Sequence, residues 1–160
     1  MVDYKQLPAN ARVWIYQSNQ VFSEAQTKEI QQNLEQFVAQ WQSHGAPVSA
    51  WAGIRYQRFV ILVVDEAQEA PSGCSIDSSV AIIKDIEQKM GVNMFDRLNL
   101  AYKVDANTVE SADREDFAAL YSAKKIDDDT TVFNNLVATK ADLETKWEIP
   151  LGTSWHANMV

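Results

Sequence analysis

Phe59-Val60-Ile61-Leu62-Val63-Val64 is the stretch of sequence that decides the fold. It shows no alternation of apolar and polar residues, so it predicts a strand at the centre of a sheet, covered on both faces. Residues 48–64 are strand-like throughout and would span roughly 56 Å at about 3.3 Å per residue, too long for a domain with a radius of gyration of about 15 Å. The polar break at 55–58 is therefore predicted to fold the chain into a hairpin, with Arg55 and Arg58 at the surface.

The elements around this hairpin predict an α+β fold. Residues 12–17 are β-branched and aromatic, which favours a strand, and Ser23 with Gln26 matches a capping box that opens a long amphipathic helix. A second amphipathic helix ends at Gly91. In residues 98–104, apolar and polar side chains alternate, which is typical of a strand with one solvent-exposed face. The order βαββαβ is that of ferredoxin-like folds, so we expect a mixed or antiparallel sheet with two long helices on one face.

The predicted strands and helices become shorter after Asp105. A short strand at 108–110, a helix at Phe117 to Tyr121, a strand ending at Phe133 and a short helix before Trp147 predict a small C-terminal αβ extension. We therefore expect residues 1–104 to form an α+β core and residues 105–160 to form an extension packed on it, in a single compact unit.

Composition limits the classes of function. The chain has 160 residues, 14 Lys and Arg against 22 Asp and Glu, and a formal charge of −8, which excludes nucleic acid and anionic membrane surfaces as expected partners. Cys74 is the only cysteine, so no internal disulfide can form and a cytoplasmic location is expected. The amino terminus lacks a signal core, and no apolar run is long enough to span a membrane, so we expect a soluble protein.

The candidate site is the polar turn Ser72-Gly73-Cys74-Ser75-Ile76-Asp77-Ser78-Ser79, which opens the second helix. Free N–H groups at a helix start can bind an anion, and strand ends such as Asp65 are where α/β proteins place ligands. The residues expected to contact a ligand are Gly73, Ser75, Asp77, Ser78 and Asp65. The alternative is structural: Ser75 or Asp77 caps the helix and Cys74 packs as a small apolar residue.

A thiol-dependent enzyme is the alternative hypothesis for function. Cys74 would be the nucleophile, with its thiolate stabilised by the helix start, and His156 in the tail would be the base. The other histidine, His44, is expected at the end of the first long helix with a structural role. No spacing of His, Cys or carboxylate residues matches a metal motif, so we expect neither a metal nor a cofactor.

The leading hypothesis is a non-catalytic binding protein whose ligand or partner contacts the turn from Gly73 to Ser79. The expected occupant is a protein partner or a small anionic ligand, and a pair of exposed tryptophans would indicate an interface, such as that of a homodimer. Asn134-Asn135 is unusual in an apolar run, and it predicts either a turn or side-chain hydrogen bonds to another loop, such as the Cys74 turn.

Two resemblances extend these predictions. Lys124-Lys125-Ile126-Asp127-Asp128-Asp129-Thr130-Thr131-Val132-Phe133, with the helix before it, resembles small GYF-like modules, which implies that residues 98–104 belong to the C-terminal module.

Read whole, the chain is similar to a family of small bacterial proteins of unassigned function. The resemblance rests on Val13-Trp14-Ile15-Tyr16, on residues 72–79, on Val132-Phe133-Asn134-Asn135-Leu136-Val137 and on Ser154-Trp155-His156. Members are often labelled "ABC transporter ATPase". A phosphate-binding loop needs a glycine followed by lysine, and no glycine in this chain is followed by one, so we do not expect ATPase chemistry.

Overall fold

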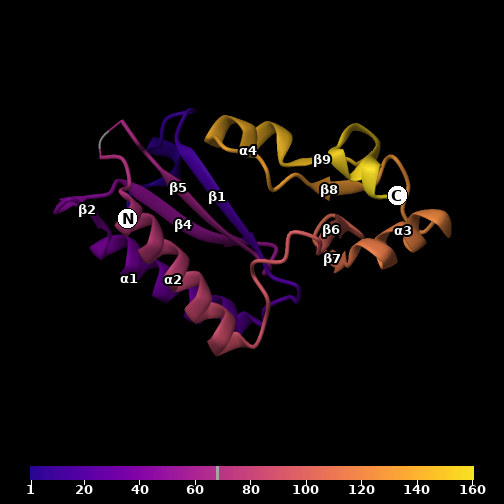
Figure 1. The fold of residues 1–160 in the computed structure, drawn as a ribbon, viewed down its shortest axis with the longest axis horizontal. Helices are drawn as coiled ribbons and strands as arrows, with labels where there is room; N and C mark the ends of the chain where they lie inside the picture. Colours follow the sequence, from indigo (N-terminus) through magenta and orange to yellow (C-terminus); the bar gives the residue numbers. More distant parts are fainter. Residues whose placement is uncertain (68) are drawn as a thin grey trace.

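The computed structural model describes residues 1–67 and 69–160, and it is an α+β structure with two main sheets (Figure 1). The strands are β1 (Arg12–Gln17), β2 (Gln42–Ser43), β3 (Ala46–Pro47), β4 (Ala50–Arg55), β5 (Phe59–Val64), β6 (Leu100–Lys103), β7 (Val109–Ala112), β8 (Thr131–Phe133) and β9 (Glu148–Pro150). The helices are α1 (Glu24–Gln40), α2 (Gly73–Met90), α3 (Arg114–Ser122) and α4 (Lys140–Lys146), with short 3-10 helices η1 (Tyr4–Gln6), η2 (Leu151–Thr153) and η3 (Trp155–Met159).

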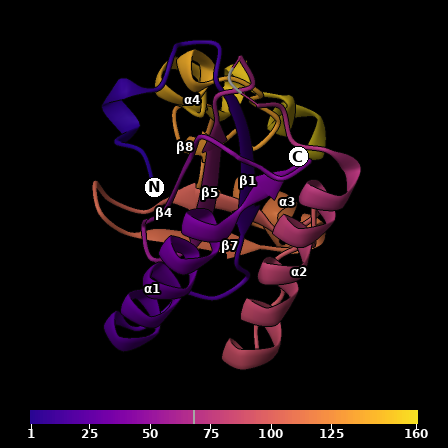
Figure 2. The ribbon, with the colours of Figure 1, turned by 90° about the vertical axis from the view of Figure 1, so that its left-hand side faces the viewer.

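The first sheet is antiparallel, with strand order β1-β5-β4. The predicted hairpin is confirmed, since Arg55 pairs with Phe59 and Ala50 with Val64. Helices α1 and α2 lie side by side on one face of this sheet (Figure 2). The capping box of α1 is also confirmed: the Ser23 hydroxyl accepts from the Gln26 N–H and the Gln26 side chain accepts from the Ser23 N–H.

Strand β5 is buried on both faces, as its continuous apolar sequence predicts. All six of its residues are inaccessible to solvent. Val60, Leu62 and Val64 point into the core beneath the two helices, and the alternate residues Phe59, Ile61 and Val63 point into a second core shared with the C-terminal part. Packing on β5 therefore holds the two halves of the molecule together.

The second sheet has the strand order β7-β6-β8-β9. Strand β6 pairs with β7 and β8, so the last strand of the expected βαββαβ sheet is not in the first sheet, and the ferredoxin-like arrangement is not what the structure has. The expected division after residue 104 would separate β6 from the strands with which it pairs. Leu100 and Tyr102 explain the difference, because their side chains lie in a third core with Phe117 and Val132.

The turn of the hairpin is the second departure from expectation. Arg58 is only 6% exposed, whereas its position in a polar turn predicted a surface side chain. Its guanidinium donates to the carbonyl of Ser18 at 3.2 Å and to the hydroxyl of Ser111 at 2.8 Å, and burial lowers its pKa. The second sheet covers the turn, so Arg58 links the end of β1 to β7.

Two further expectations concern the connections. Helix α1 ends at Gln40, and His44 lies in the turn between β2 and β3 with a positive φ of 53°, not at the helix end. The acidic loop expected at 65–71 connects β5 to α2, and Gln68 within it lies outside the described residues. Among the described helices, none is long and apolar enough to cross a membrane.

Candidate functional site

The turn at Ser72 to Ser79 forms the first two turns of α2, and its hydroxyl groups are used locally. The N-cap is Ser72, not Ser75 or Asp77 as predicted, because the helix begins at Gly73; the Ser72 hydroxyl accepts from the Ser75 N–H at 3.2 Å. The hydroxyl of Ser75 donates to the Ser72 carbonyl at 2.8 Å, and that of Ser78 donates to the Cys74 carbonyl at 3.1 Å. Gly73 and Asp77 are exposed. These contacts are those of a capped helix start.

The two residues expected to form a thiol–histidine pair lie in different parts of the molecule. Cys74 is exposed at the start of α2, and His156 lies in η3 near the carboxyl terminus. Figure 1 shows α2 and the carboxyl terminus at opposite sides of the molecule. The structure therefore does not bring Cys74 and His156 together, and the expected general base is not beside the expected nucleophile.

His156 is buried, with only 1% of its surface exposed. Its ring stacks on that of Trp155 with the centroids 3.8 Å apart, and Nδ1 lies 2.6 Å from the Ser154 hydroxyl oxygen. Burial lowers the pKa of His156 to about 4, because the charged imidazolium would lose its hydration. The ring is therefore neutral near pH 7, and it belongs to the structure of the tail.

The remaining predicted residue, Asp65, follows β5 at the first sheet. Its carboxylate accepts from the Ala67 N–H at 3.0 Å, which closes a local turn. Within residues 1–67 and 69–160, no group of three or more His, Cys, Asp and Glu side chains is arranged to hold a metal ion.

A cavity of about 630 Å³ lies between β1 and the second sheet, and it contains none of the predicted site residues except His156. One wall is the whole of β1. The others are residues 94–101, residues 133 and 135–138, and the tail residues Trp155, His156 and Met159. We call this cavity the inter-sheet cleft. Phe95, Leu98 and Leu136, which are 39%, 52% and 69% exposed, line it. Apolar side chains that gather around a cavity are typical of a binding site.

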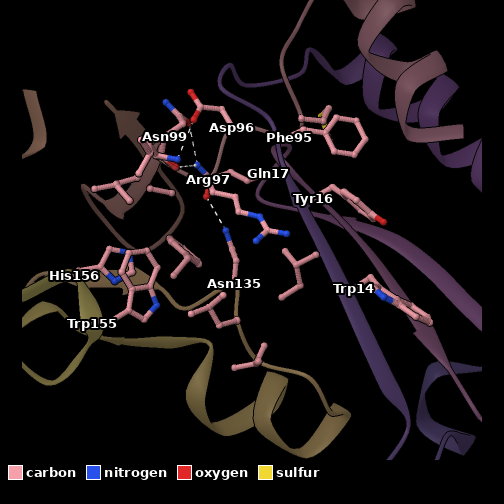
Figure 3. A pocket seen from close by; sticks show the side chains of 18 of the residues that line it. Trp14, Tyr16, Gln17, Phe95, Asp96, Arg97, Asn99, Asn135, Trp155 and His156 are labelled. Atoms are coloured by element: carbon pink, nitrogen blue, oxygen red, sulfur yellow. Dashed lines mark hydrogen bonds between the residues drawn. The ribbon is translucent and has the colours of Figure 1, made fainter. Parts of the chain in front are cut away.

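A chain of amide side chains holds the walls of the cleft together (Figure 3). The Gln17 side chain donates to the Asn99 carbonyl at 2.7 Å and accepts from the Asn135 amide at 2.9 Å. Asn135 in turn accepts from the Trp147 indole at 2.9 Å, and Asn134 accepts from the Trp155 indole at 3.0 Å. The end of β1, the start of β6 and the 134–136 turn are thereby fixed relative to one another.

The sequence predicted that Asn134 and Asn135 form either a turn or side-chain hydrogen bonds to another loop. In the structure they do both. Their partners are Gln17 and two indoles, not the Cys74 turn. Sequence reasoning missed Gln17, Asn99 and Arg97 as site residues. The signal for Gln17 was weak: it is a polar side chain at the end of an apolar strand.

The charge of the cleft differs from that of the whole chain. Arg12 and Arg97 line it together with one carboxylate, that of Asp96, whereas the chain has a formal charge of −8. Arg12 lies over the ring of Trp14 and pairs with Glu66 at 3.5 Å. The Arg97 side chain lies between β1 and Asn135 in Figure 3 and forms no ion pair with any described residue. Arg97, beside the carboxylate of Asp96, is therefore the cationic side chain of the cleft that offers a contact for an anionic group.

Compared with protein-family models, with curated proteins and with solved structures, the chain matches none. The resemblance to the family of small bacterial proteins and that to GYF-like modules therefore stay predictions, and any statement on function rests on the geometry described above.

Proposed function

We propose that this chain is a non-catalytic binding protein whose ligand or partner occupies the inter-sheet cleft. The observation that carries the proposal is the gathering of Phe95, Leu98 and Leu136 around one cavity. Exposed apolar side chains are unfavourable in water, and together they offer a surface whose burial stabilises a complex.

The chemistry of the lining supports binding over catalysis. Of the described residues that line the cleft, only Asp96 has a carboxyl group and none has a thiol, while the imidazole of His156 is buried against Trp155. A general acid–base pair or an activated nucleophile needs two such groups within hydrogen-bonding distance. Arg97 adds attraction for an anion, so the proposed ligand combines an apolar part with a negative charge.

The proposal moves the site away from the turn from Gly73 to Ser79. The hydroxyl groups of Ser72, Ser75 and Ser78 have partners within the helix start, which leaves few polar groups there for a ligand. The cytoplasmic location stays part of the proposal, and its support is the single cysteine.

The test is a screen of small carboxylates and short random peptides against the ¹⁵N-labelled protein, followed by nuclear magnetic resonance. Ligands should shift the amide signals of residues 95–99 and 135–137. Leu136→Asp should weaken their binding at least about tenfold, since it places a charge on the apolar rim without disturbing a buried group.

Val21→Asp is the matched control, because Val21 is 54% exposed and does not line the cleft. It should leave the affinity unchanged. Ligands whose signals map to residues 73–79, or affinities that Leu136→Asp and Val21→Asp change equally, would contradict the proposal.

A further inference from the structure

The backbone of β1 is the wall of the cleft with the most specific chemistry. Strand β1 is at the edge of its sheet, so only one side of its backbone pairs with β5. In an antiparallel pair, the N–H and C=O of one residue point to the same side and those of the next residue to the other side. Each residue of β1 therefore faces either β5 or the cleft.

Two hydrogen bonds fix which residues face which way. The Ser18 N–H donates to the Arg58 carbonyl at 2.8 Å, which continues the β1–β5 pairing, so the even-numbered residues face β5. The Val13 N–H donates to the Ala138 carbonyl at 2.9 Å, on the opposite side. The odd-numbered residues Ile15 and Gln17 consequently point their backbone groups away from β5, into the inter-sheet cleft.

The chain itself covers this outer edge at both ends but not in the middle. Thr139 forms an antiparallel bridge with Arg12 at one end, and the Asn19 N–H donates to the Asn93 carbonyl at 3.0 Å at the other. Between them, no backbone group of the described residues pairs with the outward N–H and C=O of Ile15. The outward backbone groups of Ile15 and Gln17 lie between these covered ends, and the two residues are about 7 Å apart at ~3.3 Å per residue.

We propose that the inter-sheet cleft binds an extended, acidic segment of a partner protein, which adds to β1 as a further strand at Ile15. This proposal rests on the proposed function above and specifies its ligand. The segment's backbone hydrogen bonds to Ile15, its apolar side chains lie against Phe95 and Leu136, and a carboxylate side chain pairs with Arg97. Peptide binding by strand addition takes its affinity from such backbone bonds and its specificity from the flanking side chains.

The guanidinium of Arg97 supports this occupant. Arg97 forms no ion pair with any described residue, so it offers a local attraction for a carboxylate on a chain whose formal charge of −8 otherwise repels acidic partners.

The experiment selects binders from a displayed library of short random peptides on the wild-type protein, then synthesises the enriched peptides with amidated carboxyl ends. Two variants isolate the backbone bond. Ile15→Ala removes most of the side chain but keeps the N–H, and Ile15→Pro removes the outward N–H as well. Proline is tolerated at an edge-strand position whose N–H does not point into the sheet, so the pairing with β5 is retained.

If the segment adds as a strand, Ile15→Pro should bind the enriched peptides about tenfold more weakly than Ile15→Ala. This is the loss of affinity expected when one ordinary hydrogen bond is removed. Arg97→Glu should weaken binding of glutamate-containing peptides by a similar factor and that of their glutamine versions less. In the wild-type complex, the amides of Ile15 and Gln17 should become protected from hydrogen exchange, a readout that holds even if Ile15→Pro does not fold.

The outcomes separate this proposal from the proposed function. Peptides or carboxylates that bind in the cleft without protecting the Ile15 amide, and equally well in both Ile15 variants, would overturn strand addition and leave a cleft-binding protein. A homodimer that Leu136→Asp dissociates would overturn the partner segment as occupant. Loss of binding on amidation would identify the terminal carboxylate, not a side chain, as the group at Arg97. Ligands that bind elsewhere on the protein and not in the cleft would overturn both proposals.

Discussion

Replacement of His156 by asparagine should flatten the pH dependence of stability. The folded protein holds the pKa of His156 at about 4, against 6.5 for a free histidine. The unfolded chain therefore binds the extra proton between these two values, and stability falls as the pH is lowered from 6.5 towards 4. At pH 5 the wild-type protein should have lost about 2 kcal/mol of its free energy of unfolding through this residue alone, because pH 5 lies about 1.5 units below the unfolded pKa of 6.5 and each unit contributes ~1.4 kcal/mol.

The assay is urea unfolding followed by tryptophan fluorescence at several values between pH 7.5 and pH 5. Asparagine places an amide near the position of Nδ1, 2.6 Å from the Ser154 hydroxyl, and does not titrate. His156→Asn loses the stacking on Trp155 and should be less stable at pH 7.5. Carboxylates titrate in both proteins, so the difference between the two curves isolates His156. The wild-type advantage should shrink by about 2 kcal/mol on acidification, and two parallel curves would refute the assignment of a buried, neutral imidazole.

Two further changes test the cores and the helix start. Trp147→Ala should lower the free energy of unfolding by about 3–5 kcal/mol, because the indole is 1% exposed and packs on Phe59 and Phe133 at ring distances of 4.9 and 5.0 Å. Trp147→Phe, which keeps an aromatic ring, should lose clearly less in the same urea titration, and equal losses would contradict this packing. Ser72→Ala should destabilise the protein by about 1 kcal/mol through the lost N-cap, whereas Cys74→Ser should stay within about 0.5 kcal/mol; a larger fall for Cys74→Ser in thermal melts would mean that the thiol is packed.

The elements that sequence predicts correctly are those whose signal is local. Phe59 to Val64 is apolar on both faces, and this alone makes β5 the central strand. Ser23 and Gln26 start a helix because their two hydrogen bonds lie within one turn of chain. No distant partner is needed for either prediction, so periodicity and capping chemistry are sufficient.

The pairing of β6 is a different problem, since an alternating strand can join either sheet. Leu100 and Tyr102 match the first sheet in pattern as well as they match the second, and the choice depends on Phe117 and Val132, which come later in the chain. The resemblance to GYF-like modules implied this placement, whereas counting elements did not. Arg58 was misjudged for the same reason: a polar residue in a turn is exposed unless another sheet covers the turn.

The cleft could be predicted only in part. Asn134-Asn135 was recognisable as an anomaly, but its partners Gln17, Trp147 and Trp155 come from distant parts of the chain. The turn at Ser72 to Ser79 is ambiguous in sequence, because serines, a glycine and a cysteine at a helix start are found both in helix caps and in binding or catalytic sites. Sequence alone does not separate these uses, and the hydrogen bonds of Ser72 and Ser75 indicate capping.

The free outer edge of β1 also bears on aggregation during folding and storage. An uncovered strand edge is a template for aggregation when edges of two folded molecules can meet. Here the exposed edge faces the inter-sheet cleft, and the charged side chains of Arg12 and Arg97, which line this cleft, oppose pairing with an uncharged apolar strand. If the proposed acidic segment binds there, it would cover this edge, and the bound form of the protein should aggregate more slowly than the free form.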